Sequence, residues 1–156
     1  MTALAIAIHW LHVGAAIVWV GAQVFVFAAL WPALLARSAA DARTILGAIM
    51  PRAARLFGPS AMLLVLTGLL RGTWLGPVRS WGALATPYGL TFAASLLLVV
   101  ALMANGGRLR SQLAARVWTG DEFRPDAGAY LQRQRTIALG GLAAVLACMV
   151  LMRFGL

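Results

Sequence analysis

Four long apolar runs dominate the pattern of this chain, and shorter arginine-containing segments separate them. The runs cover residues 3–31, 56–75, 88–105 and 136–154. A helix that crosses the hydrocarbon core of a bilayer needs about 20 mostly apolar residues. The pattern therefore predicts an all-α fold, in which residues 1–156 form a single four-span transmembrane domain folded as a four-helix bundle.

The connection between the first two runs has a pattern of its own. Over residues 38–57, charged side chains alternate with apolar ones at helical spacing, as an amphipathic helix requires. Pro51 falls inside this stretch and removes a backbone donor. We therefore expect a short interfacial helix between spans 1 and 2, interrupted at Pro51.

Composition and charge agree with a membrane protein. The chain is 62% hydrophobic and only 11% charged, against about 25% charged residues in soluble domains. The net charge is +9, and all of the basic residues behind it are arginines. Most of these arginines lie in the first and third connections. Flanking charges of this kind follow the positive-inside rule, so nucleic acid is not an expected partner.

The same rule predicts an orientation. The second connection carries only Arg71 and Arg79, and the C-terminal end only Arg153. Loops 1 and 3 should therefore be cytoplasmic and both termini outside, in a bacterial-type inner membrane. The first run continues well beyond the length of a signal-peptide core, so we interpret it as a retained span.

Few residues in the spans can carry chemistry. No Asp, Glu or Lys lies within an apolar run, and the chain has no phosphate loop, serine nucleophile elbow or zinc-protease motif. These absences disfavour a carboxylate-based proton pathway and a soluble-type hydrolase, and they leave open whether the chain is an enzyme.

Two histidines and a group of sulfur side chains remain. His9 and His12 lie at i and i+3 in the first span, roughly 9 to 14 Å below its outer end at about 1.5 Å per residue. Antiparallel packing brings Cys148, Met149 and Met152 of the fourth span to a similar depth. Imidazole, thiolate and thioether are ligands that favour copper(I), although methionine and cysteine also serve as ordinary packing residues.

His12, Trp19 and Gln23 form one stripe along the first helix, and the polar amide of Gln23 should turn this stripe towards the bundle interior. At the outer end, Arg71 and Arg79 are expected to anchor the helices at the interface. They also offer positive charge that would suit haem propionates.

Three segments resemble a known family. Leu11-His12 followed by Trp19 and Gly21, the stretch Leu66-Thr67-Gly68, and Thr86-Pro87-Tyr88-Gly89 are similar to motifs of the CopD copper-resistance membrane domain. The resemblance covers most of the chain and implies four spans and copper movement across the inner membrane. The related HemJ type shares the first-helix histidine, here His12, and implies haem b and porphyrinogen oxidation. It usually carries a lysine in the third helix, where residues 91–95 here have none.

Three hypotheses follow. The leading one is a copper-handling inner-membrane protein that binds or transports copper(I) through His12, His9, Cys148, Met149 and Met152. The alternative is a haem b protein for electron transfer or porphyrin oxidation, with His12 or His9 as axial ligand and Arg71 or Arg79 near the propionates. The third is an accessory subunit, packed in the lipid bilayer against further copies of itself or a larger membrane complex.

Overall fold

The computed structural model describes residues 2–156 and is almost entirely helical. Four helical stretches, Ala3–Leu35, Ala39–Gly72, Pro87–Val117 and Ala127–Arg153, are long and apolar enough to cross a membrane. The predicted all-α four-helix bundle is confirmed. Large apolar side chains such as Ile17, Leu97 and Leu146 remain exposed on its outside, as expected for surfaces that face lipid.

The first stretch is composed of three elements. α1 (Ala3–Phe25) continues through a π-helical turn, η1 (Val26–Leu30), into α2 (Trp31–Leu35). Pro32 lies one residue beyond Trp31, the residue that follows this turn, and proline cannot donate to the carbonyl four residues earlier. The amide of Trp31 bonds instead to the carbonyl of Val26, five residues back. The wider turn thus lets the helix pass the proline without ending.

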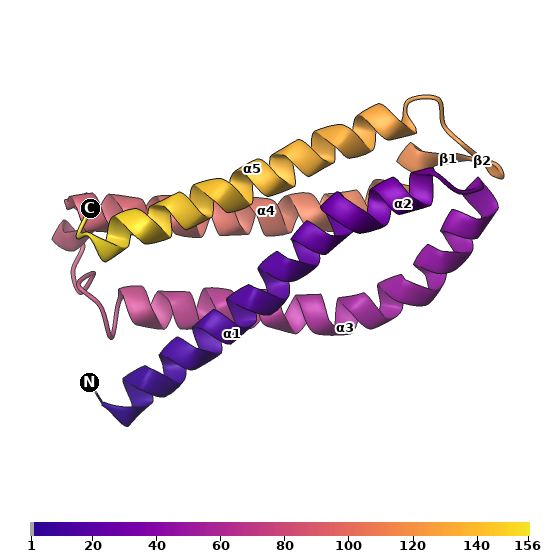
Figure 1. The fold of residues 1–156 in the computed structure, drawn as a ribbon. Helices are drawn as coiled ribbons and strands as arrows, with labels where there is room; N and C mark the ends of the chain where they lie inside the picture. The colour runs from indigo at the N-terminus through magenta and orange to yellow at the C-terminus, as the bar shows by residue number, and fades with distance from the viewer. Residues whose placement is uncertain (1) are drawn as a thin grey trace.

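α3 (Ala39–Gly72) is capped at its N-terminus by Ser38, whose hydroxyl accepts a hydrogen bond from the Asp41 amide. The break expected at Pro51 is absent, because the helix continues through Pro51 and Pro59 and curves in this region (Figure 1). Pro51 is exposed, so the carbonyl that it leaves unbonded can be solvated. The predicted interfacial helix is therefore the first half of α3 and not a separate element.

α4 (Pro87–Val117) starts at an N-cap formed by Thr86, after a short 3-10 turn, η2 (Gly82–Ala85). It extends past Asn105, where the apolar run ends, to a small hairpin of β1 (Trp118–Thr119) and β2 (Glu122–Phe123). Gly120 in the hairpin turn has φ +58°, a left-handed conformation that glycine adopts without strain. α5 (Ala127–Arg153) completes the bundle.

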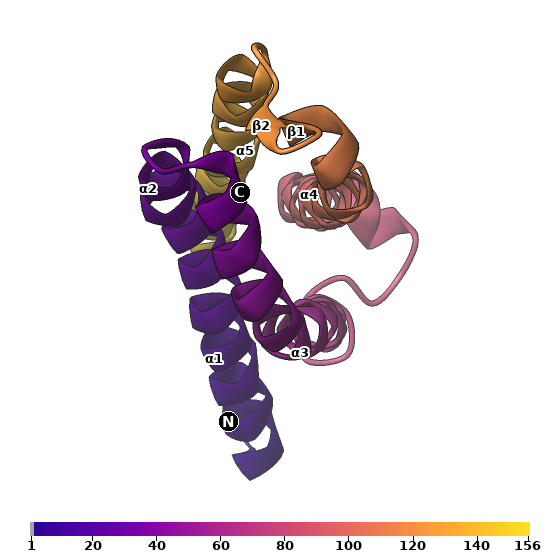
Figure 2. The same cartoon turned by 90° about the vertical axis from the view of Figure 1, so that its right-hand side faces the viewer.

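The helices pack as two pairs. α1 lies against α3 and α4 against α5, with fewer contacts between the pairs (Figures 1 and 2). Both termini and the α3–α4 connection lie at one end, here called the terminal end. The α2–α3 turn and the hairpin form the other, here called the arginine-rich end.

The arginine-rich end has its own apolar cluster, which holds the hairpin to the helices. The indole of Trp118 is buried there and donates a hydrogen bond to the Ala39 carbonyl over 3.2 Å. The guanidinium of Arg43 lies over the Trp118 ring and forms an exposed ion pair with Asp121. A second cluster, which includes Ala15 and Trp19, fills the middle of the bundle.

Candidate functional site

His12 is a buried polar group at the contact between α1 and α3. Its Nδ1 lies 2.9 Å from the hydroxyl oxygen of Thr67, and both residues are buried. The Thr67 hydroxyl itself donates to the Leu63 carbonyl over 2.6 Å. Since that hydroxyl proton is already used, Thr67 accepts from the imidazole, and His12 carries its proton on Nδ1. The lone pair on Nε2 is then free for a ligand.

Gly68 gives the imidazole its place beside α3. A Cβ at this position would lie 3.2 Å from Cε1 of His12, closer than side chains ordinarily pack. Glycine therefore lets the ring approach the α3 backbone. A similar approach occurs one turn further on, where Gly72 lies beneath the ring of Phe92 from α4.

His9 occupies a different environment from His12. Its side chain is exposed, as is that of Trp10, whereas His12 is only 9% exposed. Two residues at i and i+3 lie about 60° apart around a helix, which here separates the lipid-facing surface from the interior. His9 does not share the His12 pocket, and its role as a ligand stays a prediction.

The sulfur side chains of α5 lie at the same end of the bundle as His12. Cys148, Met149 and Met152 are all half-buried, and Cys148 is a free thiol. Met149 packs against the central apolar cluster, which includes Ala15 of α1. Across residues 2–156, no three or more His, Cys, Asp and Glu side chains are grouped closely enough to hold a metal.

The two arginines proposed for propionates also differ. Arg71, one turn after Thr67 on α3, is half-buried. Arg79 is exposed, and its Nε donates to the Gly76 carbonyl over 3.1 Å. Only Arg71 is thus placed on the same helix as the partner of His12, while Arg79 belongs to the loop.

The stripe predicted from the first helix faces the interior, as expected. His12 and Trp19 are buried, and Gln23 is half-buried against a central cavity. Sequence reasoning missed the polar partners on the neighbouring helices, above all Thr67. Thr67 and Ser95 are hydroxyl side chains within apolar runs, which is the signal that could have identified them.

No family model, curated protein or solved structure matches this chain. The chemistry of the site therefore has to be argued from its own residues.

Proposed function

We propose that this chain is a copper-handling membrane protein that binds or transports copper(I), with His12 as its central ligand. The observation that carries the proposal is the Nδ1 hydrogen bond to Thr67, which leaves Nε2 as the coordinating atom. A hydrogen bond on the second ring nitrogen is the usual way in which proteins orient a metal-binding imidazole. Copper(I) is then the cargo of the protein.

The remaining ligands come from α5. Met149, Met152 and Cys148 are soft donors, and copper(I) prefers thioether and thiolate sulfur to oxygen. Their half-buried position leaves them some freedom to change rotamer, which a cargo site needs for release. His9, exposed on the outer side of α1, would act as an entry ligand before the ion reaches His12.

A haem b site is the second candidate, and the contacts around Gly68 favour it. The close approach of the His12 ring to Gly68 resembles the small-residue packing that a flat cofactor needs. Arg71 would meet a propionate, with Arg79 as the alternative, and His12 would be the axial ligand. Haem would supply one-electron chemistry for electron transfer or porphyrin oxidation.

The third candidate is an accessory subunit in which His12 is structural. The His12–Thr67 hydrogen bond joins α1 to α3 in any case, and such bonds stabilise helix packing in membranes. In this reading the partners are further copies of the chain or a larger membrane complex.

The deciding experiment combines an absorption spectrum with copper and iron analysis of the purified full-length protein. The variants are His12→Gln and Met149→Leu. Met103→Leu is the control, since it makes the same Met-to-Leu change in the central cavity, away from His12. Copper without a Soret band, lost in His12→Gln and weakened in Met149→Leu, supports copper handling. Iron with a Soret band supports haem b instead. If wild type binds neither, the accessory role is favoured.

We further propose a bacterial-type inner membrane as the location, with the arginine-rich end in the cytoplasm and both termini outside. The support is the arginine distribution around the four spans.

A further inference from the structure

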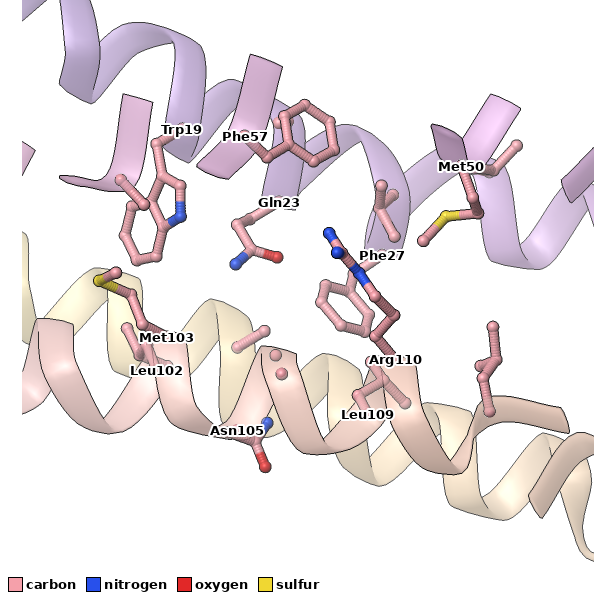
Figure 3. Close-up of a pocket in the computed structure, with 18 of the residues that line it drawn as sticks. Trp19, Gln23, Phe27, Met50, Phe57, Leu102, Met103, Asn105, Leu109 and Arg110 are labelled. Carbon is pink, nitrogen blue, oxygen red and sulfur yellow. The ribbon is translucent and has the colours of Figure 1, made fainter. Parts of the chain in front are cut away.

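A cavity of about 450 Å³ lies inside the bundle, where the two helix pairs meet. It is bordered by α1, α3, α4 and α5 (Figure 3). Its lining on the first helix starts at Trp19, beyond His12, and continues towards the arginine-rich end. Ligand sites commonly have volumes of about 300 to 1,000 Å³, so the space is of functional size. His12 does not line it.

Most of the cavity wall is apolar. Phe27, Phe57 and Met103 contribute side chains, and Trp31 and Leu102 complete the surface. Three glycines add to the open space along the wall. A Cβ at Gly58, Gly106 or Gly107 would have no neighbour within 4 Å, so each glycine leaves this space empty. Such a wall would hold a hydrocarbon chain or ring and not a hydrated ion.

Three hydrogen-bond donors face this apolar space. Gln23 and Arg110 point into the cavity, and the Trp19 indole lies at its inner end (Figure 3). Within residues 2–156, none of the three side chains has a hydrogen-bond or ion-pair partner, unlike Asn105, which donates to Gln134 over 2.9 Å. Trp19 and Gln23 are donors inside the bundle, whereas Arg110 is exposed and lines the cavity from the side of the arginine-rich end. Donors of this kind favour an occupant with acceptor groups, and a guanidinium favours an anion.

Arg110 also lines a second hollow. This hollow between α3 and α4 shares Leu46, Met50, Arg110 and Leu113 with the central cavity. The two spaces therefore adjoin at these residues, and the second extends to Arg43 and Trp118 at the arginine-rich end. An occupant from the bilayer could enter between α3 and α4 and leave its head group beside Arg110.

The helix that forms one wall is irregular at this level. Val26, Phe27 and Leu30 of the π-helical turn line the cavity. Single π-helical turns occur frequently at functional sites, because they displace side chains from the regular helical pattern. This irregularity is independent of the donors and occurs at the same place.

We propose that this cavity binds a single-chain amphiphile with an anionic head, such as a long-chain carboxylate. The head pairs with Arg110, and the chain extends past Phe27 towards Trp19. A cavity of about 450 Å³ is large enough for one acyl chain.

The cavity is separate from the proposed copper site, so the fatty-acid proposal and the copper proposal can be disproved independently. The test uses a palmitate analogue with a photoreactive diazirine near its methyl end, added to the full chain in phosphatidylcholine nanodiscs. Its methyl ester, which has no charge, is the matched ligand. We expect adducts of the acid at Trp19 or Met103, detected by peptide mass spectrometry, and unchanged adducts in His12→Gln.

Arg110→Gln should lower the yield of these adducts about tenfold, to the level of the ester, because a charge-assisted contact is lost. Arg108→Gln is the control, since both arginines are exposed on α4 but only Arg110 lines the cavity. Gly106→Leu, which fills the cavity, should abolish labelling. Equal effects of Arg110→Gln and Arg108→Gln, equal labelling by acid and ester, or full competition by a two-chain phosphatidylglycerol would overturn the proposal.

Discussion

The ring of Phe92 on α4 packs directly against Gly72 on α3 and occupies the space where a Cβ would lie. This contact joins the two helix pairs near the terminal end, where few other residues connect them. Any larger residue at position 72 must displace a buried aromatic ring.

We therefore predict that Gly72→Ala lowers the stability of the bundle by about 1 to 3 kcal/mol, the usual cost of overpacking. Gly14→Ala is the matched control, because Gly14 is also helical and a Cβ there meets no atom within 4 Å. Thermal unfolding in detergent, followed by circular dichroism, measures the difference. Adding Phe92→Leu should restore part of the loss, and equal melting of the two alanine variants would contradict the prediction.

The second prediction concerns the protonation of His12. In a His9→Gln background, ¹⁵N NMR of the single remaining imidazole should show the tautomer protonated on Nδ1, because Thr67 accepts that proton. Thr67→Ser keeps the acceptor and should keep the spectrum. Thr67→Val removes it, so the tautomers should mix and stability should fall by about 1 kcal/mol. An unchanged spectrum in Thr67→Val would show that another group orients the ring.

The third prediction tests how the hairpin is held. Trp118→Phe keeps an aromatic ring beneath Arg43 but removes the donor to the Ala39 carbonyl. We expect a loss of about 0.5 to 1.5 kcal/mol and faster proteolysis at the hairpin. Trp81→Phe is the comparison, since Trp81 is 90% exposed and should tolerate the change. Similar protease sensitivity in both variants would argue against the bond.

The fourth prediction tests orientation. In a Cys148→Ala background, a cysteine at Ser38 reports on the arginine-rich end and one at Ser80 on the α3–α4 connection. With the arginine-rich end in the cytoplasm, a membrane-impermeant maleimide added to intact cells should label the Ser80→Cys variant only. Labelling of the Ser38→Cys variant alone would invert the proposed topology.

The number and type of the elements could be predicted because each apolar run is long enough to require a spanning helix. The ends could not, because helices that leave the membrane continue with mixed residues. The third helix shows this, since it runs through Gly106 and Gly107 to Val117. Each of these glycines costs the helix only about 1 kcal/mol, which neighbouring contacts offset.

Within the site, the inward direction of His12, Trp19 and Gln23 could be predicted, since helical periodicity alone determines a shared face. The choice of Thr67 as partner could not, because contacts between helices depend on their crossing and not on spacing within one chain. The different exposure of His9 and His12 has the same origin. Which of two residues 60° apart faces inward depends on the neighbouring helix.

The pairing of α1 with α3 and of α4 with α5 has a consequence for biosynthesis. Each pair is continuous in the sequence, so both members of the first hairpin are synthesised before the second hairpin starts. The second hairpin begins only at Pro87. Two independent insertion events, followed by their docking inside the bilayer, are then sufficient to assemble the bundle. The central cavity is a space that arises only in that last step.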